Sequence, residues 1–429
     1  MHPVLNLEPL LAEPIDWRFR AFPASSRGVR IGDVGAARWN LFESGFFFPA
    51  MVLKESALAH NLRTMAEFCA DRRVALAPHG KTTMAPQLFA RQLAAGAWGM
   101  TAASVAHARV YRAFGVSRIV LANELVNPDE ARWVAAELAA DPNLDFLAYV
   151  DSPASVRILS QVFAGSSRRL HVLIELGAPG GRAGCRTDAD ALALAREIAA
   201  APGLALAGVA AFEGILGADR ARPVVDAVAA FCDRLVSVSR ALHETKLAGV
   251  AGSELVVSAG GSAYPDVVAA RLGALAADGA NARIVLRSGC YLTHDDGFYE
   301  NVSPFSARIA GAAAPHLRSA LELWAAVLSR PEPGLAVVGF GKRDAPFDAG
   351  MPVPREVRSG RASRSAAPMR VAKMNDQHAY LELPPGDPLA PGDLVGFGIS
   401  HPCLAFDRWN LIPLVDDAYE VKEAIRTFF

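Results

Sequence analysis

The chain is poor in cysteine and lacks any long hydrophobic run. It has 429 residues, and its few cysteines are scattered, odd in number and without a C-x-x-C pair, at Cys69, Cys185, Cys232, Cys290 and Cys403. This pattern argues against a disulfide framework. No stretch approaches the roughly eighteen apolar residues of a membrane span, and the first six residues lack the basic and apolar regions of a secretory signal. We therefore expect a cytoplasmic protein with no membrane partner.

An excess of charge of either sign is also missing. Lysine and arginine number 43 against 44 acidic residues, which gives a formal net charge of -1. Such a molecule has no overall basic field to attract nucleic acid, so we expect no nucleic-acid partner. With 52% hydrophobic residues, the chain can bury a large core, and its length favours two domains of unequal size.

From about residue 74 the sequence alternates short runs of Val, Ile, Leu and Ala with longer stretches of helical character. This rhythm predicts β-strands that alternate with crossover helices. The expected strands are residues 74–78, 97–103, 118–122, 146–150, 171–176, 206–212, 255–259 and 284–286. The expected helices are residues 56–69, 85–95, 105–114, 128–139, 154–163, 188–200, 223–243 and 266–277. Eight strands is the number in a TIM (β/α)8 barrel, although an open doubly wound sheet shares the rhythm.

Beyond about residue 315 the texture changes to short β-rich runs separated by Pro/Gly turns. These runs are residues 321–328, 335–340, 370–373, 379–383, 393–399 and 411–415. They predict a second, all-β domain over residues 316–429, while residues 46–315 form the barrel. Residues 1–45 have no clear period and are assigned to the β domain, to which they can add an edge strand. Residues 341–368, rich in Gly, Pro, Arg and Ser, are expected to form a long loop.

The first expected strand ends at a lysine that follows a histidine. The segment is Ala77-Pro78-His79-Gly80-Lys81-Thr82-Thr83, and barrel enzymes place their chemistry at the carboxyl ends of the strands. A lysine forms an imine with an aldehyde cofactor only as the neutral amine, which partial burial favours. Lys81 is therefore a candidate cofactor lysine, and a solvated loop lysine is the alternative.

Two glycine-bearing turns follow the seventh and eighth expected strands. The first runs from Ser258 through Gly260, Gly261 and Ser262, and the second runs from Arg287 through Gly289 and Cys290 to Tyr291. Glycines let backbone amides approach phosphate oxygens closely, and barrels frequently bind phosphate at this end. The two turns together predict a phosphate site in the same barrel as Lys81.

On these motifs the chain resembles the fold-type III pyridoxal phosphate (PLP) enzymes, whose best-known member is alanine racemase. Within them it resembles the D-serine dehydratase and D-threonine aldolase branch. The resemblance covers about residues 48–415, and it rests on the segments around His79, Arg182, Gly260, Arg287 and His401. It implies an alanine racemase-type barrel followed by a β domain, and a homodimer.

The resemblance also implies roles for individual residues. It makes Lys81 the Schiff-base lysine, with His79 beside it, and it assigns Gly260, Gly261, Ser262, Gly289, Cys290 and Tyr291 to cofactor binding. Arg287 would face the pyridine nitrogen. Because an arginine does not release its proton, the cofactor would be a milder electron sink. Arg182 would lie near the phenolate oxygen of the cofactor, or be a surface arginine.

A possible metal pair lies in the β domain at His401-Pro402-Cys403. Residues two apart project from the same side of an extended segment, and imidazole with thiolate suits zinc. The spacing alone favours the other account, a buried cysteine beside a turn histidine. The resemblance favours the metal, because the dehydratase side of the branch tends to carry His-x-Cys here and the aldolase side His-x-Asp. Nearby His378 would help to order substrate or the metal's water, or be structural.

The resemblance therefore implies a PLP- and zinc-dependent dehydratase that converts a D-3-hydroxy amino acid, D-serine-like, to a 2-oxo acid and ammonia. Thr82 and Glu213 are further expected substrate contacts, although Glu213 would otherwise pair with an arginine. A D-threonine aldolase is the nearest alternative. An alanine racemase would need a second acid/base, for which Tyr380 is the candidate. A non-catalytic PLP carrier would not need the β domain, and an interaction scaffold would not need the lysine and the phosphate turns.

Two positions depart from the pattern of the branch. Thr83 stands where a histidine or asparagine is common, and Cys290 occupies a phosphate-turn position that usually holds asparagine or an aliphatic residue. Both departures leave the identity of the substrate open.

Overall fold

The structure is a computed structural model that describes residues 4–245, 247, 254–277, 281–311 and 314–429. Contacts divide the chain into two units. The first consists mainly of Met65–Lys81 and Phe89–Gly289, and the second of Asn6–Thr64, Thr82–Leu88 and Cys290–Phe429. This division differs from the expected boundaries at residues 46 and 315, since residues 46–64 and 290–315 belong to the β-rich second unit.

The first unit contains one sheet of eight parallel strands. They are β2 (Ala75–Leu76), β3 (Met100–Ala102), β4 (Arg118–Glu124), β5 (Asp145–Val150), β6 (Leu170–Leu176), β7 (Leu204–Ala211), β8 (Leu255–Ala259) and β9 (Ala282–Leu286). Their order is β2-β9-β8-β7-β6-β5-β4-β3. The N–H of Trp98, before β3, donates to the carbonyl of Leu76 in β2 at 2.6 Å, and the N–H of Thr101 in β3 donates to the carbonyl of Pro78, after β2, at 2.9 Å. These bonds join the two end strands, so the sheet closes as a TIM-type barrel and the open-sheet alternative is excluded.

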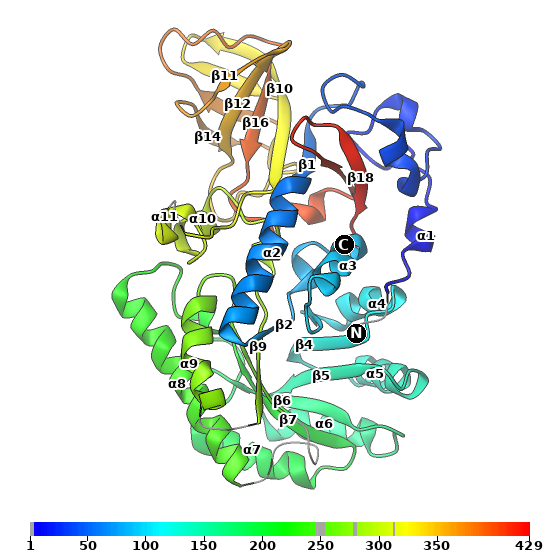
Figure 1. Ribbon diagram of the computed structural model, residues 1–429, viewed down its shortest axis with the longest axis vertical. Coiled ribbons are helices and arrows are strands. Elements are labelled where there is room, and N and C mark those ends of the chain that lie inside the picture. The colour runs from blue at the N-terminus through cyan, green and yellow to red at the C-terminus, as the bar shows by residue number, and fades with distance from the viewer. Residues whose placement is uncertain (1–3, 246, 248–253, 278–280, 312–313) are drawn as a thin grey trace. The chain divides into compact units, whose positions relative to one another are not determined.

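Helices follow the strands and lie around them (Figure 1). They are α3 (Pro86–Ala94), α4 (Val105–Ala113), α5 (Pro128–Ala140), α6 (Pro153–Phe163), α7 (Asp188–Ala200), α8 (Arg222–Glu244) and α9 (Pro265–Ala277). The start of α5 shows why the sequence begins a helix there. Pro128 occupies its first turn, and the Asn127 side chain accepts the N–H of Asp129 at 2.9 Å, which satisfies a donor that the helix itself leaves unpaired.

Side chains fill the interior of the barrel. The cluster consists of small and branched residues with one aromatic ring, namely Ala77, Val120, Leu147, Tyr149, Leu173, Ala207, Ala210, Val256 and Val285. Since the barrel is a packed core and not a pore, polar chemistry is left to the ends of the strands. Within the described residues no helix combines the length and the apolar character that crossing a membrane requires.

The second unit is built on a β sheet. Its main path runs β13-β12-β16-β10-β1-β17-β18, and β11, β15 and β14 extend it from β10. The strands are β1 (Ala50–Lys54), β10 (Leu321–Glu332), β11 (Leu335–Val338), β12 (Val353–Ser359), β13 (Ala362–Ser365), β14 (Arg370–Met374), β15 (Ala379–Glu382), β16 (Leu394–Gly398), β17 (Leu411–Val415) and β18 (Val421–Arg426). Short helices α1 (Glu8–Leu11), α10 (Phe298–Val302) and α11 (Ala307–Ala310) accompany it. Helix α2 (Glu55–Arg72) follows β1.

Two expectations for this unit are wrong. The expected loop over residues 341–368 contains the strands β12 and β13. The expected edge strand from residues 1–45 is not among the described residues 4–45, whose β pairing consists of isolated bridges, such as that between Pro14 and Arg30. The contribution comes instead from β1, which lies inside the sheet between β10 and β17.

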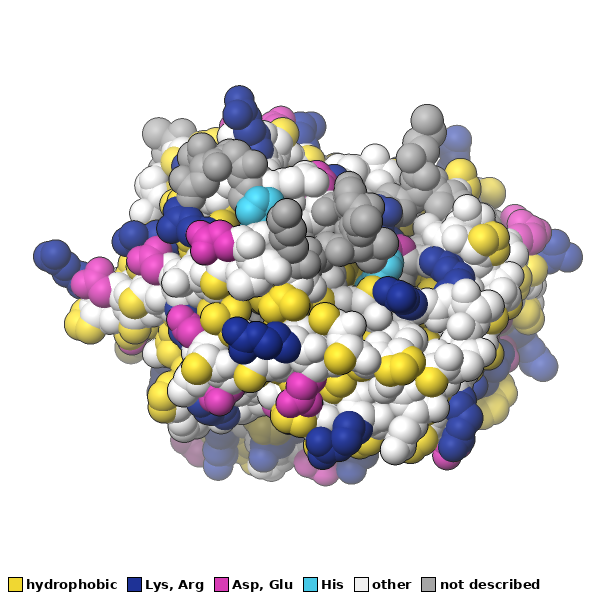
Figure 2. All heavy atoms as spheres, turned by 90° about the horizontal axis from the view of Figure 1, so that it is seen from below, with side chains coloured by type: hydrophobic (Ala, Val, Ile, Leu, Met, Phe, Trp, Pro, Cys, Tyr) yellow, Lys and Arg dark blue, Asp and Glu magenta, His cyan; other side chains and the backbone are white. Residues whose placement is uncertain are grey.

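The surface carries both signs of charge. Figure 2 shows one face of the molecule, on which lysine and arginine side chains are interspersed with aspartate, glutamate and hydrophobic ones. This mixture agrees with the net charge of -1.

Candidate functional site

Lys81 lies in a tight turn directly after β2, in the first unit. The turn spans Gly80–Thr82, and the adjacent His79 pairs with Thr101 of β3. A side chain at position 80 would clash, because a Cβ there would come within 2.4 Å of the Tyr111 hydroxyl. That hydroxyl donates to the carbonyl of Thr101 at 3.1 Å. Gly80 therefore lets a buried tyrosine hold the lysine turn against the neighbouring strand. The Lys81 side chain is exposed.

The histidines near Lys81 are uncharged. Burial, together with the positive charges of Lys81, Arg287 and Arg182, holds the pKa of His79 well below its usual value. Burial and the charge of Lys81 also lower the pKa of His107. Both imidazoles are therefore neutral at neutral pH and can accept as well as donate hydrogen bonds.

Four buried polar atoms at this end of the barrel have no partner among the described residues. They are His79 Nδ1, His107 Nδ1, Tyr149 OH and Arg287 Nε. Leaving a buried polar atom unpaired costs about 1–3 kcal/mol, and native proteins leave few of them. A polar ligand bound next to Lys81 would form hydrogen bonds with these unpaired atoms. The ring nitrogen and the polar ring substituents of PLP could do so.

The side chain of Arg287, directly after β9, is held firmly in place. It is only 2% exposed, and its terminal nitrogens donate to Ser258 Oγ and to the carbonyl of Ala211, both at 2.6 Å. Two bonds from opposite branches hold the guanidinium rigidly and leave Nε as the unpaired donor. Arg182 differs, since its side chain is 55% exposed and lies 4.0 Å from Glu175.

Glu213 occupies the amides that were expected to bind phosphate. Its carboxylate is fully buried and accepts the N–H groups of Gly260 at 3.0 Å and Gly261 at 2.6 Å. The expectation that these two amides are donors for phosphate is therefore corrected, as is the pairing of Glu213 with an arginine. Ser262 and Gly289 lie on the same two turns, with Ser262 partly exposed and Gly289 buried.

Because Glu213 ties two turns together, Glu213→Gln should destabilise the protein. The amide group presents an N–H to one of the two backbone donors, so a buried donor loses its acceptor. We expect the free energy of unfolding to fall by about 2 kcal/mol, measured by urea titration. Glu197→Gln, on an exposed position of α7, is the matched control and should change little. Equal stability of both variants would contradict this role.

Three carboxyl groups after neighbouring strands were not predicted. Glu124 ends β4, Asp151 follows β5 and Glu175 lies near the end of β6. Burial and a hydrogen bond with Glu175 raise the pKa of Glu124 to about 8, so Glu124 holds a proton at neutral pH. The signal was available, since both glutamates lie at or just beyond the carboxyl ends of expected strands, where barrel enzymes carry their chemistry.

The second unit brings together a separate group, the thiol–imidazole cluster of Cys290, His401 and Cys403. One donor atom from each residue lies within 4.8 Å of the others, and the two sulfur atoms are 3.4 Å apart. Thr82 Oγ1 lies 3.9 Å from each sulfur. Sulfur and nitrogen donors in this arrangement suit zinc. The sequence paired His401 with Cys403 but assigned Cys290 to phosphate.

Asp348 orients the histidine of the cluster. Its Oδ2 lies 2.6 Å from His401 Nδ1, which leaves Nε2 as the second ring nitrogen. A carboxylate behind a histidine is a common support for a metal ligand. Burial lowers the pKa of His401, but hydrogen bonds with Cys290 and Asp348 outweigh it and raise the pKa to about 9. A metal takes the neutral imidazole, so its binding here would release a proton. Asp348 lies in the stretch that was expected to be a loop.

Three other expected residues lie in separate segments of the second unit. His378 is exposed in the turn between β14 and β15 and is not one of the three clustered donors. Tyr380 lies on β15, where its hydroxyl accepts from Asn375 Nδ2 at 3.2 Å. Tyr291 is buried in the short turn that begins at Cys290.

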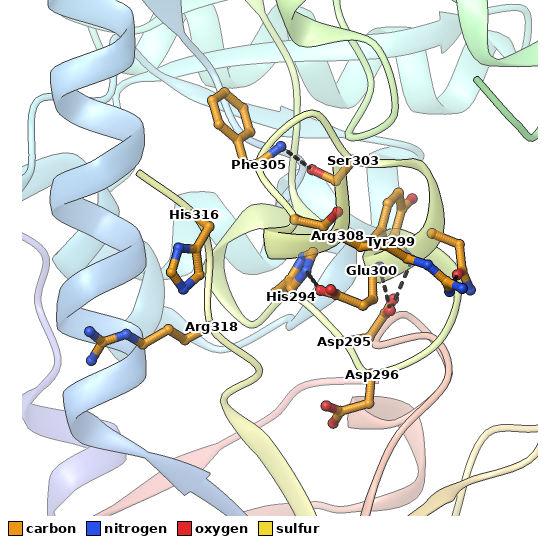
Figure 3. Close-up of polar contacts among 12 residues, drawn as sticks. His294, Asp295, Asp296, Tyr299, Glu300, Ser303, Phe305, Arg308, His316 and Arg318 are labelled. Carbon is orange, nitrogen blue, oxygen red and sulfur yellow. Dashed lines mark hydrogen bonds and ion pairs between the residues drawn. The ribbon is translucent and has the colours of Figure 1, made fainter. Parts of the chain in front are cut away.

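The loop after Cys290 places a tyrosine beside the cluster. In Figure 3, Asp295 lies under the start of α10 and accepts backbone N–H groups, from Gly297 and Tyr299 at 2.9 Å and from Glu300 at 3.4 Å. The Tyr299 phenol hydrogen-bonds with Cys290, and burial holds its pKa well above the usual value. The Tyr299 and His401 rings are 5.9 Å apart.

Asp295 should make the stability depend on pH. Burial raises its pKa from 3.8 to about 7, so between these values the folded state holds a proton that the unfolded state has lost. Stability then falls as pH rises from about 4 to 7, by at most about 4 kcal/mol. Asp295→Asn keeps the acceptor oxygen and removes the charge. We expect the variant to lose less stability than the wild type between pH 5 and pH 8 in urea titrations; parallel losses would contradict the assignment.

Comparison with known proteins adds to this geometry. The alanine racemase N-terminal domain matches residues 53–276, and a putative serine dehydratase domain matches residues 320–415. A D-threonine aldolase of an Arthrobacter species is 26% identical over 79% of this chain and 80% of its own.

Solved structures share the fold. The D-threonine aldolase of Filomicrobium marinum has a TM-score of 0.71 at 26% identity and covers 89% of this chain and 95% of its own. The D-threo-3-hydroxyaspartate dehydratase of a Delftia species has a TM-score of 0.69 at 21% identity, with 89% of this chain and 97% of its own covered.

Proposed function

The chain belongs to the family of the alanine racemase N-terminal domain, in the D-serine dehydratase and D-threonine aldolase branch of the fold-type III PLP enzymes, and from this premise we propose that it is a PLP- and zinc-dependent dehydratase. It converts a D-3-hydroxy amino acid, D-serine-like, to a 2-oxo acid and ammonia. The observation that carries the proposal is the sulfur and nitrogen donor set of His401 and Cys403, in a chain that also has a lysine at the end of the first barrel strand.

The barrel residues would bind PLP, and one of them would take a proton from the substrate. Lys81 would bind the cofactor, and its amine would serve as the base that takes the α-proton of the substrate. PLP, when bound, withdraws electrons from the α-carbon. Arg287 would face the ring nitrogen and, because a guanidinium keeps its own protons, would leave that nitrogen unprotonated. The neutral imidazole of His79 and the protonated carboxyl of Glu124 offer further hydrogen bonds to the ring substituents.

The cluster residues would bind the metal that stabilises the leaving β-hydroxyl. His401 and Cys403 would hold zinc, which would supply a Lewis acid for the β-oxygen of the substrate. Asp348 fixes Nδ1 of the His401 ring, so that the other nitrogen would be available to the metal. The phenol of Tyr299 stays protonated and can donate a hydrogen bond there. A β-elimination needs a base that takes the α-proton and an acid that assists the leaving hydroxyl. Lys81 would be the base, and the metal would be the acid.

Cleavage of the Cα–Cβ bond, as in a D-threonine aldolase, is the second candidate. Relatives with that activity are 26% identical to this chain. The same lysine and metal would serve, but the β-hydroxyl would lose its proton instead of leaving. Cys403 favours elimination, because the aldolase side of the branch tends to carry aspartate at that position.

Product analysis separates the two. The purified enzyme, with PLP and zinc, is given D-serine or D-threonine, and the L-enantiomers serve as controls. We expect ammonia and a 2-oxo acid in equal amounts. Glycine and an aldehyde without ammonia would overturn the dehydratase assignment in favour of the aldolase. The proposal also places a homodimer in the cytoplasm, and light scattering of the purified protein tests the dimer.

A further inference from the structure

Cys290 lies in the thiol–imidazole cluster, although its sequence position is that of a phosphate turn. It directly follows Gly289 on the turn after β9, and it is only 5% exposed. Its sulfur is 3.4 Å from the sulfur of Cys403. We propose that Cys290 is a third protein ligand of the metal, so that the centre is Cys2His and not the His-x-Cys pair alone. The inference rests on the proposed function, which supplies the metal.

The spacing of the donors fits one tetrahedral ion. Two sulfurs bound to zinc at about 2.3 Å lie about 3.8 Å apart at the tetrahedral angle. The observed 3.4 Å is close to this value and far from the roughly 2.05 Å of a disulfide bond. All three donor atoms lie within 4.8 Å of one another. Cys290 therefore needs no change of the backbone to join His401 and Cys403 on one ion.

Hydroxyl groups surround the two sulfurs. Thr82 Oγ1 lies 3.9 Å from both of them, and the phenol of Tyr299 hydrogen-bonds with Cys290. The thiolate is the form of cysteine that binds metal. Hydroxyl groups that donate hydrogen bonds stabilise two thiolates that lie close together. The other buried cysteines, Cys69, Cys185 and Cys232, are not in this cluster, so the placement of Cys290 is specific.

A third ligand changes what the centre can do. Two thiolates and a neutral imidazole balance the charge of a divalent ion, and three protein ligands leave one tetrahedral position open. Cys2His is the ligand set with which zinc serves alcohol dehydrogenase. A centre without net charge gives no attraction to a second carboxylate on the substrate. We therefore expect a preference for D-3-hydroxy amino acids with uncharged side chains, such as D-serine, over 3-hydroxyaspartate.

X-ray absorption of the zinc-loaded protein counts the sulfur ligands directly. We expect two sulfurs at about 2.3 Å in the wild type and one in Cys290→Ser. Competition with a chromophoric chelator should show zinc affinity at least about tenfold weaker in the variant. Cys69→Ala, a buried cysteine of α2 outside the cluster, is the control and should keep both sulfurs and the wild-type affinity.

The outcomes separate this inference from the proposed function. One sulfur in the wild type, unchanged in Cys290→Ser, would remove Cys290 from the metal and leave His401 and Cys403 in place. A wild type that binds no zinc would overturn the metal role altogether. If the variant fails to fold, the number of sulfurs in the wild type still decides. Relative kcat/KM for D-serine over D-threo-3-hydroxyaspartate should fall by about tenfold in the variant as the centre gains charge, and an unchanged ratio would overturn the inferred substrate preference.

Discussion

Lys81→Ala is expected to abolish turnover and the absorption band of lysine-bound PLP. The variant loses both the covalent link to the cofactor and the amine that takes the α-proton, so kcat should fall by about 10³-fold or more. The lysine turn itself should survive, because Gly80 and Tyr111 hold it against the neighbouring strand and the Lys81 side chain is exposed. Absorption spectra of the purified protein, with and without added PLP, measure the first effect, and ammonia release measures the second.

Controls distinguish loss of the base from loss of the fold. Lys373→Ala removes an exposed lysine of β14 and should leave band and turnover intact. A small primary amine in the buffer should restore part of the activity of Lys81→Ala, since it supplies the missing base. If the band persists in Lys81→Ala, the cofactor assignment is wrong.

The eight barrel strands could be predicted from the sequence because each one carries its own local signal. Short runs such as β5 and β6 are buried along nearly their whole length, as parallel strands covered on both faces are. The strands β12 and β13 carry no such signal. The burial of β12 alternates irregularly around Pro354 and Val357, and β13 is almost wholly exposed. Their structure comes from pairing with β16 and with each other, which no local pattern records.

The site divides in the same way. Lys81, Arg287, His401 and Cys403 stand at motif positions, so residue type and place in the chain pointed to them. Cys290 did not, because its contact with Cys403 joins positions 113 residues apart. Asp348 lies 53 residues from His401, inside a stretch whose composition resembles a loop. The fold makes contacts between residues so far apart in sequence. The local motif around Cys290 indicated only the phosphate turn.

Removal of the metal is expected to stop product formation while leaving the cofactor in place. Dialysis against a chelator should lower ammonia release by at least about 10²-fold, since the β-hydroxyl loses its Lewis acid. The band of lysine-bound PLP should remain, because Lys81 and the barrel residues do not depend on the cluster for that bond. Zinc should restore activity. Exchange of the α-proton with deuterated solvent should continue in the metal-free protein, since Lys81 takes that proton.

Substitutions in and beside the thiol–imidazole cluster test the role of the metal one residue at a time. His401→Ala should reproduce the metal-free protein. Asp348→Asn keeps the ligand but weakens the support behind it, so zinc affinity should fall by about 10–100-fold and excess zinc should rescue it. His243→Ala, an exposed histidine of α8, is the control and should bind zinc as the wild type does. Full turnover by a protein whose zinc content is zero by elemental analysis would rule out the metal. Lys81, or the protonated Glu124 that lies in the same unit, would then have to supply the acid for the leaving hydroxyl.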